Sequence, residues 1–149
     1  MTLTRTWILV ADGARARILC NDGPGKGLHA VEGCVFQGEH ARTHEMMSDR
    51  EGRMASSVGS ARSAVQARSD PHRELKRKFA HKLADELALR LAQQAYDRLI
   101  IIAAPSVLGD LRHALSENVR DVLTGELAKD LTKTPDDEIA SHVMHILRA

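Results

Sequence analysis

The residues best suited to chemistry in this chain are arginines gathered between residues 37 and 72. That segment holds five arginines and no lysine. The planar guanidinium group donates paired hydrogen bonds to phosphate or carboxylate, so arginine without lysine favours recognition of an anionic partner over general solubility. Further cations follow directly after this segment. The sequence therefore predicts these nucleic-acid-binding residues: Arg42, Arg50, Arg53, Arg62, Arg68, Arg73, Lys76 and Arg77.

Two less specific interpretations of the segment stay open. The first is a plain mobile loop, because acidic residues interleave with the arginines and nearly cancel their charge. The second is protein contact, including self-association of the chain. Aromatic residues make up only 3% of the sequence and fall mostly at predicted core positions, so base stacking is not expected. Binding of nucleic acid would be directed at the phosphate backbone and would weaken with salt.

Two pairs of histidines have the spacing of metal ligands on one helix face. His40 and His44 lie four apart beside Glu45, but the order is not H-E-x-x-H and no helical pattern surrounds them. His142 and His145 lie three apart and flank apolar positions of a predicted helix. We interpret the first pair as exposed loop side chains and the second pair as side chains at the edge of the core. The sequence predicts no metal site and no cofactor.

Other catalytic patterns are incomplete. Residues 23–27 contain glycines and Lys26 but not the spacing of a phosphate-binding loop, which favours a simple turn. Cys34 has no identifiable base for nucleophilic catalysis. Asp12 ends an apolar run, where a nuclease would hold a metal-binding carboxylate, but Arg15 and Arg17 would crowd a divalent cation there. The prediction is a protein without catalytic residues, with a metal-dependent hydrolase as an alternative.

The composition indicates one domain in a reducing compartment. The chain has 149 residues, a formal net charge of +1 and two cysteines. In a hairpin centred near Pro24, Cys20 would lie opposite about Leu28 and Cys34 opposite about Ala14. The two thiols would not face each other, so we expect both to be free.

The start of the chain does not resemble a secretion signal. The apolar run from Trp7 to Ala11 is short, and Asp12 and Gly13 follow it at once. No segment approaches the roughly 20 apolar residues of a membrane helix. We therefore expect a cytoplasmic protein that does not enter a membrane.

The first part of the chain predicts an antiparallel meander of strands. Residues 7–11 are apolar without alternation, which is typical of a strand buried on both faces. Asp12-Gly13 predicts a two-residue hairpin turn, because glycine tolerates the positive φ of a primed turn. Residues 14–18 alternate with a period of two, and residues 28–36 form a third, less regular strand. Residues 37–72 follow as a long loop within the same domain.

The second part predicts helices that alternate with strands. Asp70-Pro71 begins a helix in which apolar residues recur every four positions, and Tyr96-Asp97 ends it after about five or six turns. Residues 98–104 form a buried strand parallel to the first, because a helix connects the two blocks. Residues 105–115 then form a shorter helix.

The region from residue 116 to residue 133 allows two interpretations. Residues 122–127 form either an edge strand, which we favour, or an extension of the preceding helix. The last element is a helix that Thr134 caps and Pro135 opens. The order β-β-β, loop, α-β-α-β-α predicts an α/β fold with a mixed five-stranded sheet, similar to ribonuclease H.

Four sequence blocks together resemble a bacterial family, the host attachment proteins ("required for attachment to host cells"). These blocks are WILVADGARARIL at residues 7–19, Asp70-Pro71-His72, YDRLIIIAAPSVLGDLR at residues 96–112, and Lys129 to Thr132. They occur in the family's order and span almost the whole chain. The family name is a genetic label, so the resemblance implies a fold and no mechanism.

The element order also resembles the middle domain of eukaryotic and archaeal peptide release factors and of the ribosome-rescue protein Pelota. In those proteins the loop before the long helix reaches the active centre of the ribosome, and release factors carry Gly-Gly-Gln there. The corresponding loop here reads VGSARSAVQ at residues 58–66, with one glycine and a distant glutamine. The resemblance therefore implies the non-hydrolytic role of Pelota rather than peptide release.

The leading hypothesis from the sequence is a non-enzymatic domain that binds the ribosome or structured RNA through residues 37–72. Its rival from another class is a protein-interaction or attachment-related factor without RNA contact. Ribosome or RNA binding predicts an affinity that falls steeply with salt, whereas an adhesin predicts protein exposed on the cell surface.

Overall fold

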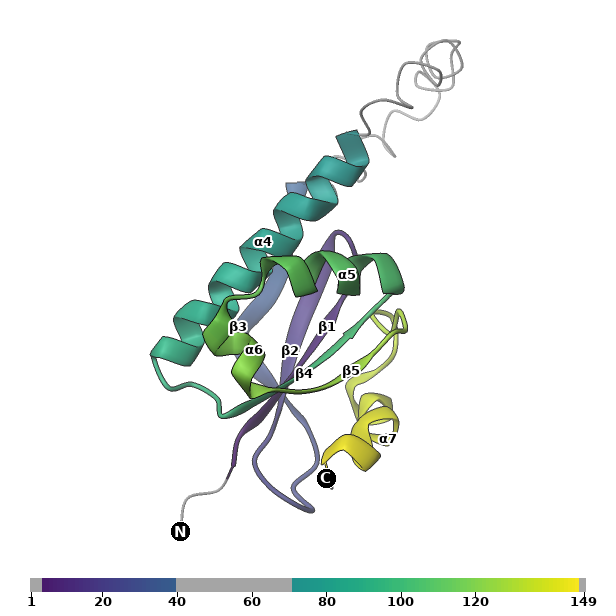
Figure 1. The fold of residues 1–149 in the computed structure, drawn as a ribbon. Helices are drawn as coiled ribbons and strands as arrows, with labels where there is room; N and C mark the ends of the chain where they lie inside the picture. Colours follow the sequence, from purple (N-terminus) through teal and green to yellow (C-terminus); the bar gives the residue numbers. More distant parts are fainter. Residues whose placement is uncertain (1–3, 40–70, 148–149) are drawn as a thin grey trace.

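The computed structural model describes residues 4–39 and 71–147. In this part of the chain, one mixed sheet of five strands is flanked by four helices, which confirms the predicted α/β class (Figure 1). The strands are β1 (Thr6–Ala11), β2 (Arg15–Asn21), β3 (His29–Gln37), β4 (Arg98–Ala103) and β5 (Leu123–Leu127). The helices are α4 (Pro71–Ala92), α5 (Pro105–Ala114), α6 (Glu117–Val122) and α7 (Asp136–Leu147).

The spatial order of the sheet is β3-β2-β1-β4-β5. β1 pairs antiparallel with β2 and parallel with β4, and all six residues of β1 are buried. Parallel pairing of β1 with β4 follows from the long connection through α4, as the sequence predicts. The two most apolar strands therefore lie next to each other in the middle of the sheet, and β3 and β5 form its edges.

The two faces of the sheet carry separate cores because successive side chains of a strand point to opposite faces. In β1, Trp7 and Leu9 pack in the cluster that α4, α5 and α6 cover, while Ile8 and Val10 pack against α7. Figure 1 shows α4 and α5 on one side of the sheet and α7 on the other. Three helices thus cover one face and a single helix covers part of the other.

The turn after β1 is tight, as predicted, but its chemistry differs from the prediction. Asp12 Oδ1 accepts hydrogen bonds from the backbone N–H groups of Ala14 at 2.7 Å and Arg15 at 2.6 Å. Gly13 is not among the glycines with positive φ, so the predicted left-handed glycine is wrong. A Cβ at Gly13 would lie 2.8 Å from Cγ of Lys76, so the position instead needs a small residue where α4 passes.

The β2–β3 hairpin departs from the simple register predicted for it. Cys20 pairs with His29, one residue from the predicted partner, but Arg17 pairs with Val35. β3 therefore contains extra residues between these two points, and Gly33 takes a φ of 79° there. The predicted pairing of Cys34 with Ala14 is wrong for this reason, because a bulge adds residues to one strand only. Both cysteines are nevertheless free and buried.

Several element boundaries in the second half differ from the prediction by one or more residues. α4 ends at Ala92, and Gln94 follows with a φ of 61° in the left-handed conformation that often terminates helices. The favoured strand at 122–127 is confirmed as β5, but a separate helix, α6, precedes it. The Ser116 hydroxyl caps α6 by accepting from Val119 N at 3.3 Å. α7 begins at Asp136, one residue after the predicted start.

Candidate functional site

The predicted nucleic-acid-binding residues divide into two groups. Arg42, Arg50, Arg53, Arg62 and Arg68 fall within residues 40–70, outside the described residues, so their role stays a prediction. The ends of the predicted 37–72 loop belong to regular elements, because Gln37 ends β3 and residues 71 and 72 begin α4. We keep the name 38–70 loop for the predicted connection between β3 and α4, of which only Gly38 and Glu39 lie within the described residues. The remaining three predicted residues lie on the first turns of α4.

The first half of α4 is strongly basic. The first fully buried side chain of this helix is Phe79, and Figure 1 shows the earlier turns projecting beyond the strands. Five cations and one carboxylate lie between Pro71 and Lys82. The rest of the helix carries two carboxylates and one arginine. We call the five cations the α4 basic platform: Arg73, Lys76, Arg77, Lys78 and Lys82.

The charges of this platform oppose the stability of the helix. The N-terminus of a helix carries partial positive charge, which favours acidic rather than basic residues there. Arg73 and Arg77, and likewise Lys78 and Lys82, have the i,i+4 spacing at which like charges repel. Helix formation by itself therefore does not account for this arrangement.

Some of the platform is already engaged within the protein. Arg73 donates to both carboxylate oxygens of Asp110 on α5, at 2.9 and 2.8 Å, and the Asp110 side chain is only 10% exposed. Arg77 forms an exposed pair with Glu74 at 3.1 Å. Of the predicted binding residues, Arg73 is thus a tether between two helices, while Arg77 holds a weak surface pair that solvent screens.

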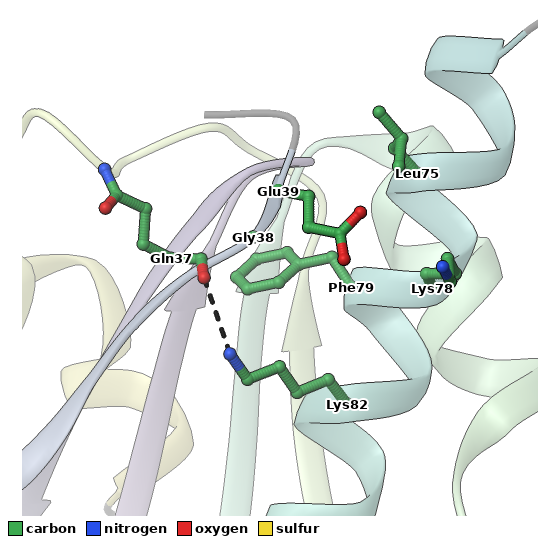
Figure 2. Close-up of a pocket in the computed structure, with 7 residues that line it drawn as sticks. All are labelled: Gln37, Gly38, Glu39, Leu75, Lys78, Phe79 and Lys82. Atoms are coloured by element: carbon green, nitrogen blue, oxygen red, sulfur yellow. Dashed lines mark hydrogen bonds between the residues drawn. The ribbon is translucent and has the colours of Figure 1, made fainter. Parts of the chain in front are cut away.

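None of the three platform lysines is held by an acidic group within the described residues. Within residues 4–39 and 71–147, neither Lys76 nor Lys78 forms an ion pair. Lys82 Nζ lies 3.4 Å from the backbone oxygen of Gln37, a neutral acceptor (Figure 2). These ammonium groups keep their charge available to an external anion.

Two hollows open beside the platform. One, of about 280 Å³, lies at the base of the 38–70 loop and is lined by Glu39, Lys78 and Lys82 around the ring of Phe79 (Figure 2). The other, of about 300 Å³, lies between α4 and α5. The second hollow is lined by Arg73, Arg77, His81, Asp110 and His113. Cations and histidines outnumber carboxylates in both, so each favours an anionic group such as phosphate.

A larger groove of about 790 Å³ lies at the hairpin end of β1 and β2, next to Thr132 and Lys133. In this groove Arg17 donates hydrogen bonds to Asp136 Oδ1 at 2.9 Å and to the backbone oxygens of Thr132, at 2.7 Å, and Thr134. Thr132 Oγ1 lies 3.4 Å from the second oxygen of Asp12. Asp12 and Arg17 therefore act as structural groups that join the sheet to the segment before α7.

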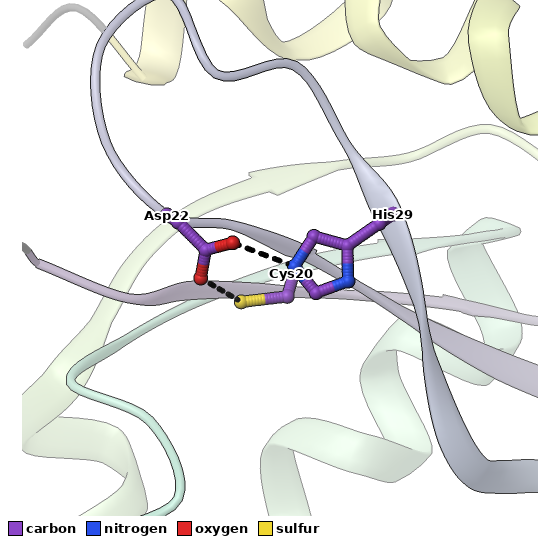
Figure 3. Close-up of side chains that lie close together, drawn as sticks. All are labelled: Cys20, Asp22 and His29. Carbon is purple, nitrogen blue, oxygen red and sulfur yellow. Dashed lines mark hydrogen bonds and ion pairs between the residues drawn. The ribbon is translucent and has the colours of Figure 1, made fainter.

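Sequence reasoning missed a cluster of three potential metal ligands at the other end of β2. Cys20 is the last but one residue of β2, Asp22 follows the strand, and His29 begins β3 (Figure 3). Their ligand atoms all lie within 4.8 Å of one another. The available signal was the placement of ligand-type residues on both sides of one hairpin turn, because a hairpin brings its two ends together.

The remaining histidine predictions have different outcomes. His40 and His44 lie outside the described residues. His142 is half-buried and His145 is exposed on α7, which fits the predicted edge of the core.

Residues 23–27 form the predicted turn, closed by a hydrogen bond from Lys26 N to Gly23 O at 3.1 Å.

The cluster of Cys20, Asp22 and His29 shifts the pKa values of two of its members. Burial, and then the nearby Asp22 carboxylate, raise the pKa of Cys20 to about 12. The hydrogen bond from His29 lowers the pKa of Asp22. Without a metal, the cluster thus holds a protonated thiol and an ionised carboxylate at neutral pH.

Cys20 is expected to make the protein less stable at alkaline pH. The unfolded chain loses the thiol proton near its ordinary pKa of 9.0, whereas the folded protein keeps it to about pH 12. The unfolded state then binds fewer protons, so the free energy of unfolding falls by about 1.4 kcal/mol per pH unit above pH 9. Below pH 9 the contribution of Cys20 is constant.

Urea unfolding between about pH 8 and pH 11, with a chelator present, measures this effect. The Cys20→Ala variant should show a shallower fall than the parent. The Cys20→Ala variant will still lose some stability as the pH rises, because burial also raises the pKa values of Cys34 and Tyr96. If the free energy of unfolding falls equally with pH in the parent and in Cys20→Ala, the raised pKa of Cys20 is contradicted.

None of the helices within residues 4–39 and 71–147 has the length and apolar character of a membrane-spanning segment. A comparison with curated proteins finds no relative that matches the chain. A comparison with family models gives one assignment, and it covers nearly all of the sequence. The family is described as "Protein required for attachment to host cells", and its model matches residues 7–143. The chain belongs to this host attachment family.

Proposed function

We propose that this protein binds structured RNA, on the ribosome or free, through the 38–70 loop and the α4 basic platform. The observation that carries the proposal is the separation of charge along α4. Five of its six cations lie between Arg73 and Lys82, in the half of the helix that follows residues 38–70, whereas the other half carries two carboxylates and one arginine. Phosphate is the anion that such a surface suits best, because RNA presents it as a regular array.

The two hollows beside the platform support backbone-directed contact. In each hollow, cationic side chains outnumber carboxylates two to one. Lys78 and Lys82 face the first hollow, while Arg77, His81 and His113 face the second. Exposed aromatic platforms for base stacking are not part of this surface, since Phe79 is buried. Binding would therefore depend on the shape and charge of the RNA rather than on base identity.

The proposal also draws on the resemblance of the element order to the middle domain of release factors and Pelota. In that comparison the loop before the long helix is the element that contacts the ribosome. The loop here lacks Gly-Gly-Gln, so the proposed role is non-enzymatic binding in the cytoplasm rather than hydrolysis of peptidyl-tRNA.

The test is the affinity of the purified protein for tRNA and for ribosomes at several salt concentrations. The variant Arg50→Gln/Arg53→Gln/Arg62→Gln/Arg68→Gln should bind at least about tenfold more weakly than the parent. The slope of log K against log salt should fall by about 1 for each lost phosphate contact. The proposal expects these arginines to contact RNA rather than the folded core, so the free energy of unfolding should stay close to that of the parent.

A control of equal charge change separates specific contact from net charge. Its four substitutions remove exposed cations that belong to neither the loop nor the platform: Lys26→Gln, Arg120→Gln, Lys129→Gln and Lys133→Gln. This control should bind RNA nearly as well as the parent. A second variant, Lys76→Gln/Arg77→Gln/Lys78→Gln, tests the platform itself. Equal affinities for parent, loop variant and platform variant would refute RNA binding through this surface.

The family description favours a second candidate, an attachment-related factor that acts through protein contacts. Val35, on the edge strand β3, is 78% exposed, and an apolar side chain on a sheet edge suits contact with another protein. Cell fractionation distinguishes the candidates. Protein found mainly at the cell surface would favour attachment, whereas protein that sediments with ribosomes at low salt would favour RNA binding.

A further inference from the structure

We propose that Cys20, Asp22 and His29 form a binding site for a thiophilic divalent transition-metal ion, with Zn²⁺ as the best fit. The site is independent of the proposed RNA surface. The β2–β3 ladder separates the two, since Arg15 pairs with Gln37 at its loop end and Cys20 pairs with His29 at its other end. Three facts support it: the spacing of the ligand atoms, their chemistry, and the groups that hold them in place.

The spacing of the ligand atoms suits one ion. His29 Nε2 lies 2.7 Å from one oxygen of Asp22, and Cys20 Sγ lies 3.5 Å from the other. With Zn–S of about 2.3 Å and Zn–N and Zn–O of about 2.0 to 2.2 Å, tetrahedral geometry separates ligand atoms by about 3.3 to 3.6 Å. The 3.5 Å sulfur–oxygen distance falls within this range, whereas the 2.7 Å nitrogen–oxygen hydrogen bond must lengthen by about 0.6 Å, which a rotation of the exposed His29 side chain can supply.

The donor set matches the charge and softness of Zn²⁺. A thiolate and a carboxylate carry two negative charges, and the imidazole binds in its neutral form. The side chains of Asp22 and His29 are 45% and 57% exposed, which leaves solvent access for a water molecule as fourth ligand. Three protein ligands and a water are typical of zinc sites that keep an open position.

Neighbouring groups hold the ligands in place. His29 Nδ1 lies 3.4 Å from the backbone oxygen of Ala30, the contact that directs the other ring nitrogen toward a metal. The buried Asn21 side chain donates to Gly27 O at 2.9 Å and accepts from Gly23 N at 3.1 Å. These bonds fix the turn that carries Asp22, so little ordering of the backbone is needed when an ion binds.

Metal binding exchanges protons for the ion. The S–H bond of Cys20 breaks as the S–metal bond forms, and its proton goes to solvent. His29 binds the ion through Nε2 as the neutral tautomer that carries its proton on Nδ1, which faces the Ala30 carbonyl. The other charged groups that act on Cys20 are Arg5 and Asp97, and they pair with each other at 3.3 Å. Because these two opposite charges pair with each other, together they add little electrostatic repulsion toward a bound cation.

The experiment uses the full chain without a histidine tag, reduced by a non-chelating reductant and freed of metal by dialysis. Titration with Co²⁺ should give one equivalent of binding and a thiolate-to-cobalt charge-transfer band in the near ultraviolet. Zn²⁺ should abolish the band by displacing Co²⁺. The affinity for Zn²⁺, measured in competition with a chromophoric chelator, should fall at least about tenfold in His29→Gln, Asp22→Asn and Cys20→Ala.

His29→Gln is the decisive variant, because the side chain is exposed and its loss leaves the core intact. Matched controls are Cys34→Ala, which removes the other buried thiol, and His113→Gln, which removes an exposed histidine elsewhere. Both controls should keep the cobalt band. The proposal is overturned if the parent shows no charge-transfer band at millimolar Co²⁺, or if Cys20→Ala and His29→Gln bind Zn²⁺ as tightly as the parent. Failure of RNA binding would leave this result unaffected.

Discussion

Replacement of Phe79 by alanine is expected to lower the free energy of unfolding by about 3 to 5 kcal/mol. Phe79 is the first buried side chain of α4 and is only 3% exposed. Its ring packs on the backbone of Gly38, where an added Cβ would lie 2.9 Å from Cδ1 of the ring (Figure 2). Removal of the ring leaves a cavity that the surrounding sheet and helix can fill only in part.

Urea unfolding followed by circular dichroism measures this loss. Leu89→Ala is the matched control, because Leu89 lies on the same helix but is 52% exposed. Its expected cost is below about 0.5 kcal/mol, since leucine and alanine both favour helices and little packing is lost. A cost for Phe79→Ala no greater than that of Leu89→Ala would show that α4 does not depend on this anchor.

Replacement of Arg17 by methionine is expected to cost about 2 to 4 kcal/mol. Its guanidinium group donates to the backbone oxygens of Thr132 and Thr134 and to the carboxylate of Asp136. Charge-assisted bonds of this kind contribute more than neutral ones, and their loss leaves part-buried carbonyl groups without a donor. The segment before α7 would then lose its main connection to β2.

Two further variants test this explanation. Arg17→Lys should recover part of the loss, because it keeps the charge but cannot make three bonds in one plane. Arg77→Met, at a side chain that is 53% exposed, should cost less than about 0.5 kcal/mol. A similar cost for Arg17→Met and Arg77→Met would mean that the carbonyl contacts of Arg17 contribute nothing to stability.

Arg17 and Arg73 show why the basic residues of this chain cannot be treated as one binding surface. Arg17 and Arg73 look as suitable for phosphate binding in the sequence as their neighbours do. In the structure, Arg17 joins β2 to the segment before α7, and Arg73 joins α4 to Asp110 on α5. Substitution of either would weaken the fold, so a loss of RNA binding in such a variant would be ambiguous. Lys76 and Lys78 give a cleaner test.

Local patterns in the sequence determined most of the elements and their order, although they did not predict the separate helix α6. An apolar run without alternation predicts a strand buried on both faces, and both such runs became the central strands β1 and β4. Apolar residues at every fourth position predicted α4, with Pro71 as its first residue. These features depend on neighbours a few residues apart, which is why the sequence alone sufficed for them.

The tertiary structure decided features that depend on contacts between distant segments. The bulge in β3 moved the partner of Cys34, and no local signal shows how many residues such a bulge contains. The pairing of Arg73 with Asp110 requires that α5 pack beside α4. The cluster of Cys20, Asp22 and His29 exists because the hairpin register brings the end of β2 to the start of β3. Residue types set which chemistry is available to this protein, but the packing of its elements set which of those groups meet.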